Sequence, residues 1–279
     1  MLSISIGSLS LPVDRLLLLL SFALAMLVSY IVGRKNKCSA DGKIAMIFIA
    51  AMLIARAVFV IEYWTEYRQD WWSIIDIRDA GFNAWVGITA MVVLTALVYW
   101  KNSKIRRSLL SGAIAGMLLW GLVTFGLWII KDTSQKLPKI VVSQLSSDDI
   151  ELSQIATDKP RVINLWATWC PPCRREMPVL QQAQRQNSDV GFIFVNQGEH
   201  PAVIEQFLEQ EALQLNNVVA DDKAMLGQLI GSRALPTTLF VNEQGELIDA
   251  HLGELSRASL AAKLERLKQP QADKYEVND

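Results

Sequence analysis

The segment Trp166-Ala-Thr-Trp-Cys-Pro-Pro-Cys-Arg-Arg-Glu-Met-Pro178 contains Cys170 and Cys173, two of the chain's three cysteines. An apolar run, Val162–Trp166, precedes the cysteines and predicts a strand. The two prolines suit the first turn of a helix, which we expect over Pro171–Gln186. The cysteines therefore lie where a strand meets a helix, in a C-x-x-C spacing that occurs in metal sites, cross-links and redox centres.

Two of these three possibilities fit the sequence poorly. Zinc usually takes four ligands, and the chain's two histidines, His200 and His251, do not stand in zinc spacing, so we expect no metal. A disulfide between residues three apart closes almost no loop, so it would add little as a structural cross-link. Redox exchange is the remaining chemistry.

The position of the pair favours a reactive thiolate. Cys170 precedes the helix, where unpaired N–H groups and the helix dipole stabilise negative charge. Arg174 and Arg175 add positive charge one turn away, so we expect a lowered pKa for Cys170, which would make it the attacking thiolate. Cys173 lies one turn further in. We expect it to be more buried and to resolve the mixed disulfide.

The rest of the second half alternates between apolar and amphipathic segments. We expect strands and helices at these positions: strands at Val190–Val195, Val218–Ala220, Thr237–Val241 and Glu246–His251, and helices at Pro201–Leu213, Lys223–Ile230 and Ser256–Leu267. Such an alternation, closed by a hairpin and a last helix, predicts an α/β domain around a central sheet. This half carries 21 acidic and 15 basic residues, which does not resemble a nucleic-acid-binding surface.

The first half contains four long apolar runs. They are Leu16–Val32, Ile44–Ile61, Ala84–Trp100 and Leu109–Ile130. Each is long enough for a helix that crosses the hydrocarbon layer, which needs about 17–25 residues. We therefore expect a four-helix transmembrane domain over residues 1–130, a linker over 131–139 and the α/β domain over 140–279.

Charges in the connecting loops predict the orientation. The first and third loops each carry four basic residues, against one acid and none, whereas the middle loop has five acids and two bases. By the positive-inside rule the first and third loops are cytoplasmic. Both termini and the α/β domain would then face the periplasm of a bacterial inner membrane, an oxidising compartment.

Two motifs resemble a known family. Asn164–Pro178 is similar to the active-site strand and helix of TlpA/ResA-like membrane-anchored thioredoxins, and Ala234–Asn242 is similar to that family's second signature. The resemblance covers roughly residues 139–267. It implies a thioredoxin fold and dithiol–disulfide exchange with protein partners, usually in the reducing direction, with no cofactor besides the cysteine pair.

The resemblance also implies roles for particular residues. Pro236 would be a cis proline facing the cysteines, and Leu235 would pair its backbone with a substrate strand. Trp169 would pack over the disulfide or contact substrate. Pro171 and Pro172 stiffen the turn beside the substrate and remove two backbone donors, which favours a less oxidising pair.

Glu176 is a candidate for proton transfer. The family often has glutamate three residues after the second cysteine, and a carboxylate one turn from Cys173 could move protons during exchange. Alternatively, Glu176 is a solvated residue favoured by the helix dipole. Thioredoxin has a buried aspartate where this chain has Asn164, which cannot act as a base. Proton handling would then fall to Glu176 or to water.

The membrane half weakly resembles prolipoprotein diacylglyceryl transferase. Ile54–Glu62 is similar to that enzyme's arginine-bearing helix and Asp79–Gly87 to its glycine-rich segment. The enzyme's histidine in the latter segment is missing, because the first histidine here is His200. We interpret the resemblance as a shared fold without the transferase activity.

Three further features of the membrane half carry expectations. Arg56 lies near the outer end of its run and would extend to the interface, or pair with Asp76 or Asp79. Gly112 to Gly116 forms a G-x-x-x-G spacing that would pack against a helix of the chain or of a partner. Cys38 has no second cysteine near it in the sequence, so we expect an incidental thiol and an electron supply from another protein.

These features together predict a membrane-anchored periplasmic disulfide reductase. A membrane thiol–disulfide interchange transporter would supply electrons, and extracytoplasmic proteins with disulfides would accept them. Membrane lipid is the other expected partner, and nucleic acid is not expected. The alternatives are an oxidant that introduces disulfides, an acyltransferase-like membrane enzyme with a regulatory redox domain, and a non-catalytic assembly factor.

Overall fold

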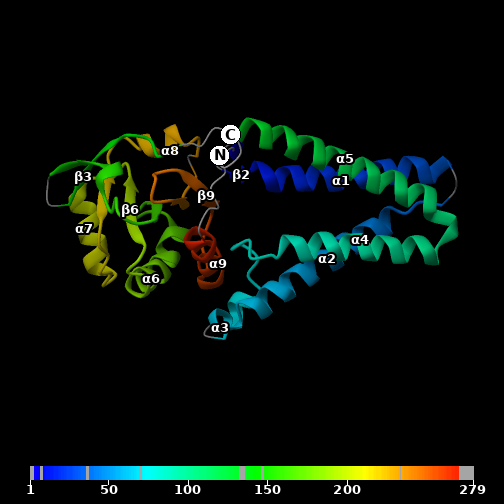
Figure 1. Ribbon diagram of the computed structural model, residues 1–279, viewed down its shortest axis with the longest axis horizontal. Helices are drawn as coiled ribbons and strands as arrows, with labels where there is room; N and C mark the ends of the chain where they lie inside the picture. Colours follow the sequence, from blue (N-terminus) through cyan, green and yellow to red (C-terminus); the bar gives the residue numbers. More distant parts are fainter. Residues whose placement is uncertain are drawn as a thin grey trace, which may run out of the picture. The chain divides into compact units, whose positions relative to one another are not determined.

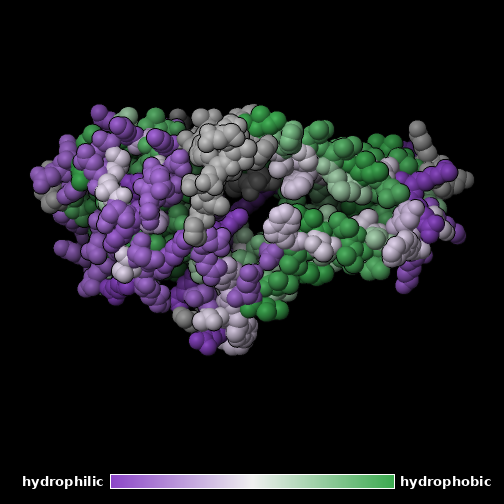
Figure 2. Space-filling view, viewed as in Figure 1, coloured by the Kyte–Doolittle hydropathy of each residue, from purple (hydrophilic) through white to green (hydrophobic). Residues whose placement is uncertain are grey.

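The computed structural model describes residues 3–6, 9–35, 38–68, 71–131, 136–145, 148–232 and 234–269. The chain forms two compact units. The helical unit comprises residues 3–70 and 80–133, and the sheet unit comprises residues 1–2, 71–79 and 134–279. Figure 2 shows a mostly hydrophobic surface on the long helices and a mostly hydrophilic surface on the sheet unit.

Four long helices make up most of the helical unit (Figure 1). They are α1 (Val13–Lys35), α2 (Asp41–Glu62), α4 (Ala84–Lys101) and α5 (Arg106–Lys131). Each predicted apolar run lies within one of them, and all four are long and apolar enough to cross a membrane. Shorter elements accompany them: β1 (Ser3–Ile6), β2 (Leu9–Pro12), α3 (Trp64–Tyr67), η1 (Trp71–Ile74, in the sheet unit) and η2 (Ser103–Ile105).

Close packing of α1 against α5 uses the predicted small residues. A Cβ at Gly112 would lie 2.6 Å from the Ala25 carbonyl oxygen, and one at Gly116 would lie 3.0 Å from the Ser21 carbonyl oxygen. The Ser108 hydroxyl, also on α5, donates to a backbone carbonyl of α1 at 2.7 Å. The G-x-x-x-G spacing therefore serves a contact within the chain, which confirms the first of the two alternatives.

Arg56 of α2 is 7% exposed. Its Nη1 donates to the Gly81 carbonyl at 2.8 Å. The guanidinium carbon lies 5.2 Å from the ring centroid of Tyr67 and 5.8 Å from that of Phe82. The backbone carbonyl and two aromatic rings therefore hold the guanidinium inside the unit, and its position relative to a membrane interface stays a prediction.

The sheet unit contains a seven-stranded sheet in the order β4-β3-β7-β6-β5-β8-β9. Its strands are β3 (Val141–Gln144), β4 (Asp149–Glu151), β5 (Arg161–Trp166), β6 (Gly191–Gln197), β7 (Val218–Asp221), β8 (Thr237–Val241) and β9 (Leu247–Leu252). The three central strands β5, β6 and β7 are parallel, and the remaining pairings are antiparallel. This arrangement confirms the predicted α/β domain around a central sheet.

Helices and loops cover both faces of the sheet. They are α6 (Pro171–Gln186), α7 (Pro201–Gln210), α8 (Met225–Leu229), α9 (Arg257–Lys268) and the short η3 (Leu152–Gln154). Buried residues of α6, α7 and α9 pack on one face, and α8 with η3 packs on the other. Side chains of β5 alternate between these faces, so that Val162 and Trp166 point toward α6 whereas Ile163 and Leu165 point away.

The structure corrects parts of the predicted layout. The linker expected over 131–139 is too long, because Lys136 pairs with Glu246 and the Leu137 N–H donates to the Gly245 carbonyl at 2.9 Å. The helix expected to reach Leu213 ends at Gln210. Strands β3 and β4 were not predicted. Helix α6 has the predicted bounds.

Substitution of Gly112 by Leu is expected to destabilise the helical unit, because the added side chain meets the backbone of α1. Overpacking of this kind typically lowers the free energy of unfolding by about 1–3 kcal/mol. Gly121→Leu is the matched control, since a Cβ there meets nothing within 4 Å. Thermal unfolding of the full chain in detergent would show a lower Tm for the first variant only. Equal Tm values would contradict the packing.

Candidate active site

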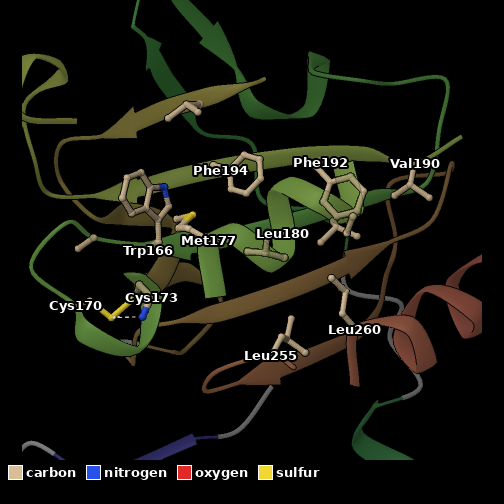
Figure 3. Packing of buried hydrophobic residues seen from close by; sticks show 14 of the residues in the cluster. Trp166, Cys170, Cys173, Met177, Leu180, Val190, Phe192, Phe194, Leu255 and Leu260 are labelled. Atoms are coloured by element: carbon tan, nitrogen blue, oxygen red, sulfur yellow. Dashed lines mark hydrogen bonds between the residues drawn. A yellow bond between two sulfur atoms is a disulfide. The ribbon is translucent and has the colours of Figure 1, made fainter. Parts of the chain in front are cut away.

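The two cysteines lie at the start of α6, directly after the turn that follows β5 (Figure 3). Cys170 is the N-cap residue, and its Sγ accepts from the Cys173 N–H at 3.3 Å. Their Cα atoms are 5.3 Å apart, and the sulfurs form a disulfide. Cys173 is fully buried and Cys170 is 3% exposed. The predicted order of burial is confirmed, but both sulfurs lie close to the core.

The tryptophans on either side of this turn differ in exposure. Trp166 is fully buried and packs against Phe207 of α7, with ring centroids 5.5 Å apart. Trp169, next to Cys170, is 67% exposed. Trp166 is therefore part of the core, whereas Trp169 presents a large apolar surface beside the disulfide, where a partner protein can contact it.

The arginines after the cysteines are both paired with carboxylates. Arg174 binds Glu211, and Arg175 binds Glu254 with 2.6 Å between Nη2 and Oε2. These acids balance the positive charge that the sequence led us to expect near Cys170. The N-terminus of α6, with its N–H groups and dipole, is then the main source of stabilisation for a thiolate at Cys170.

Glu176 is fully buried, on the face of α6 that packs on the sheet. Its Oε1 accepts from Asn164 Nδ2 at 2.8 Å, and its Oε2 accepts from the Leu255 N–H at 2.9 Å. Burial raises the pKa of Glu176 to about 8, against the two hydrogen bonds, which lower it. The alternative of a solvated glutamate is wrong.

The protonation of this carboxyl therefore changes around pH 8, one helical turn from Cys173. Groups whose pKa lies near the working pH are suited to donate and accept protons. The geometry is consistent with the proton-transfer role, which stays a prediction.

A second carboxylate, that of Glu199, forms hydrogen bonds with the loop before Cys170. Its oxygens accept from the Thr168 N–H at 2.7 Å, from the Thr168 hydroxyl at 2.5 Å and from Asn196 Nδ2 at 2.7 Å. Glu199 was not predicted as part of the site. Its signal was the polar run Asn196 to Glu199 at the end of β6, because neighbouring parallel strands end at the same edge of a sheet.

The bond between Leu235 and Pro236 is cis, as the resemblance implied. The Pro236 carbonyl accepts from the Gly253 N–H at 2.9 Å, which joins the start of β8 to the end of β9. Leu235 packs against the same apolar cluster that contains both cysteines. Backbone pairing of Leu235 with a substrate strand stays a prediction.

The structure also places the residues considered as metal ligands. His200 caps α7, where its Nδ1 accepts from the Ala202 N–H at 3.3 Å, and His251 lies buried in β9. Within the described ranges, His, Cys, Asp and Glu do not form a group of three that could hold a metal ion.

We expect the buried carboxyl to make stability depend on pH. The folded chain keeps the Glu176 proton up to about pH 8, whereas the unfolded chain releases it near 4.5. The folded state therefore binds more protons across this window, and its stability falls as the pH rises. Glu176→Gln removes this dependence, so its stability relative to the parent should rise by roughly 5 kcal/mol between pH 4.5 and 8.

The measurement is denaturant unfolding of the oxidised full chain at several pH values, with tryptophan fluorescence as the signal. Glu211→Gln is the control, because Glu211 is a partly exposed acid in an ion pair at the surface. Parallel pH profiles for the parent and Glu176→Gln would show that Glu176 titrates as it does in the unfolded chain.

The sequence matches known redox proteins. The Redoxin family profile matches residues 132–264. The thiol-disulfide oxidoreductase ResA of Halalkalibacterium halodurans is 31% identical over 130 residues, which cover 46% of this chain and 73% of that relative. The thioredoxin-like protein YneN of Bacillus subtilis is 28% identical over 166 residues, which cover 54% of this chain and 96% of YneN.

Solved structures of similar proteins include StoA from Bacillus subtilis, at 22% identity with a TM-score of 0.40, covering 46% of this chain and 97% of StoA. A DsbF homologue from Corynebacterium diphtheriae has 21% identity and a TM-score of 0.43, covering 49% of this chain and 88% of the homologue. From the match to ResA and the Redoxin profile, together with the paired cysteines at the start of α6, the chain belongs to the ResA-like thiol-disulfide oxidoreductases.

Proposed function

We propose that this oxidoreductase is anchored in the bacterial inner membrane and reduces disulfides of extracytoplasmic proteins through Cys170 and Cys173. The observation that carries the proposal is the placement of the cysteine pair. Cys170 caps α6 beside the exposed Trp169, and Cys173 lies one turn from the fully buried Glu176. A thiol pair, a contact surface and a proton acceptor are the three parts that this exchange needs.

The exchange begins with both cysteines reduced. The Cys170 thiolate attacks one sulfur of the substrate disulfide, which breaks, and the departing substrate thiolate takes a proton from water. Cys173 then gives its proton to Glu176 in its ionised form, whose fraction rises as the pH approaches 8, and attacks Cys170 Sγ. The second substrate thiolate leaves, and the Cys170–Cys173 disulfide forms. Two electrons pass from the chain to the substrate, and Glu176 returns its proton when the pair is reduced again.

Trp169, Pro171, Pro172 and the Leu235–Pro236 segment form the substrate-contact surface in this proposal. Trp169 supplies apolar area at 67% exposure. Pro171 and Pro172 occupy the first turn of α6, next to Cys170. Leu235 would offer its backbone to an extended substrate segment, as family members are expected to do.

The location rests on the four candidate spans and the charges of their loops. The positive-inside rule predicts that the end of α5, and therefore the sheet unit, lies on the periplasmic side. The chain has one further cysteine, Cys38. A single thiol cannot relay two electrons as a disulfide, so the electron donor is a separate protein, and a membrane thiol–disulfide interchange transporter fits that requirement.

We expect Cys173→Ala to accumulate mixed disulfides between Cys170 and partner proteins, because the resolving thiol is gone. Non-reducing electrophoresis and mass spectrometry of the complexes would identify the partners. Cys38→Ala is the control and should leave the pattern of the parent. Cys170→Ala should give no adducts. If Cys173→Ala traps nothing in growing cells, the exchange proposal fails.

The direction of electron flow is tested by alkylating thiols in intact cells. A reductase keeps its cysteines mostly reduced, provided that the electron donor is present. An oxidant that introduces disulfides would be found mostly oxidised. A reagent that cannot cross the inner membrane should label reduced Cys170 but not Cys38. Labelling of Cys38 alone would contradict the proposed orientation.

A further inference from the structure

The amide of Asn164 lies between two polar side chains in the core next to the cysteines. Asn164 belongs to β5 and is 1% exposed. Its Nδ2 donates to Glu176 Oε1 at 2.8 Å and to Thr238 Oγ1 at 2.9 Å. Thr238, on β8, is fully buried and stands directly opposite Asn164 in the antiparallel pairing. Cross-strand partners on one face lie close together, so the sheet itself sets this contact.

The other end of the amide has no partner. Asn164 Oδ1 is buried without a hydrogen bond among the described residues. A buried acceptor left unpaired costs free energy, so some other contact must favour this orientation. If the amide turned over, Oδ1 would face the Glu176 carboxylate, and two acceptor oxygens would repel each other. The observed orientation is therefore the one that an ionised Glu176 favours, because a hydrogen bond to a charged acceptor is strong.

Thr238 restrains the amide in that orientation. Its hydroxyl oxygen accepts the second N–H of Asn164 Nδ2, so both amide protons are used. A valine at this position would keep the shape of the side chain but would leave one amide proton unpaired.

We infer that Asn164 and Thr238 form a positioning pair that stabilises the ionised form of Glu176 and so sets the pH at which the rate of disulfide exchange changes. This inference rests on the proposed proton role of Glu176. The pair does not touch the substrate or the sulfurs in this account. It acts through the Glu176 carboxyl group, whose protonated form is favoured by burial and whose ionised form is favoured by the hydrogen bond from Asn164.

Other groups around Glu176 contribute to the same balance. The Leu255 N–H donates to its second oxygen, and the charge of Glu254 opposes ionisation. Glu254 is itself paired with Arg175, and its carbonyl lies 3.3 Å from His251 Nε2. Cys173 lies on the same helix as Glu176, one turn from it. The backbone N–H cannot be removed by mutation without a change of conformation, so Asn164 is the donor that can be tested.

The test is the pH profile of exchange, measured with the full chain in detergent and a synthetic peptide that contains one disulfide. Asn164→Leu removes the donor at similar size, so the pKa of Glu176 should rise. The inflection in rate should move upward by about one pH unit, the equivalent of a weak charged hydrogen bond. Thr238→Val should move the inflection in the same direction by a smaller amount. Thr238→Ser keeps the hydroxyl group and should show the inflection at the same pH as the parent.

Thr237→Val is the matched control. Thr237 is a buried threonine next to Thr238, and its hydroxyl donates to the Ala234 carbonyl at 2.7 Å and lies 3.0 Å from the Ser232 hydroxyl. Its loss removes buried hydrogen bonds, as the loss of the Thr238 hydroxyl does, but should leave the inflection in place. If Asn164→Leu does not fold, the comparison of Thr238→Val with Thr238→Ser and Thr237→Val still decides the inference.

Glu176→Gln separates this inference from the function on which it rests. The profile should lose its inflection in that variant. Suppose that Glu176→Gln loses the inflection but the Asn164 and Thr238 variants keep it at the pH of the parent. The inference about the positioning pair is then overturned, while the role of Glu176 stands. If Glu176→Gln keeps the inflection, another group titrates and the inference falls with the proton role. If the parent does not reduce the peptide at any pH, the proposed reductase function itself fails.

Discussion

The burial of one carboxyl group beside a thiol pair is the constraint on which the rest of the site depends. Glu176 has no exposed surface, and two donors, Asn164 and the Leu255 N–H, hold its oxygens. An acid in such a place resists ionisation until about pH 8. Cys170 caps α6 and Cys173 lies in its first turn. A change in the charge of Glu176 therefore alters the electrostatic potential at the thiols, about one turn away. The sheet, the helix and the loop before α9 meet to make this arrangement possible.

The fold places each part of the site by simple rules. Alternation along β5 points Asn164 toward α6, on the same face as Val162 and Trp166. The parallel neighbour β6 ends at the same edge as β5, which brings Glu199 to the loop before Cys170. The antiparallel strand β8 supplies Thr238 and follows the cis Pro236. The site is thus built from three adjacent strands and the helix that begins after the central one.

Local signals in the sequence were enough to predict the strand and the helix that hold the two cysteines. Strand β5 and helix α6 could be predicted because apolar residues and prolines mark their ends, and the cis Pro236 followed from a family motif. The surroundings of Glu176 could not be predicted in the same way. Leu255 is 79 residues from Glu176, and the acids that pair with Arg174 and Arg175 are 37 and 79 residues away. Burial and charge pairing at these positions depend on tertiary contacts, so the sequence left the two interpretations of Glu176 open.

The same limit explains the outcome for the helical unit. Hydropathy located the four long helices, and glycine spacing pointed to the contact between α1 and α5. The burial of Arg56 depends on the Gly81 carbonyl, 25 residues away, and on two aromatic rings, so it could not be predicted from the position of Arg56 along one helix.

The account is tested most directly by infrared spectroscopy of the oxidised full chain, with the Glu176→Gln variant subtracted. The difference spectrum reports the protonated carboxyl group of Glu176 as the pH is changed. The account predicts that this band persists through neutral pH and disappears around pH 8. A band that disappears near pH 4.5 would show an ordinary solvated glutamate and would contradict the central claim.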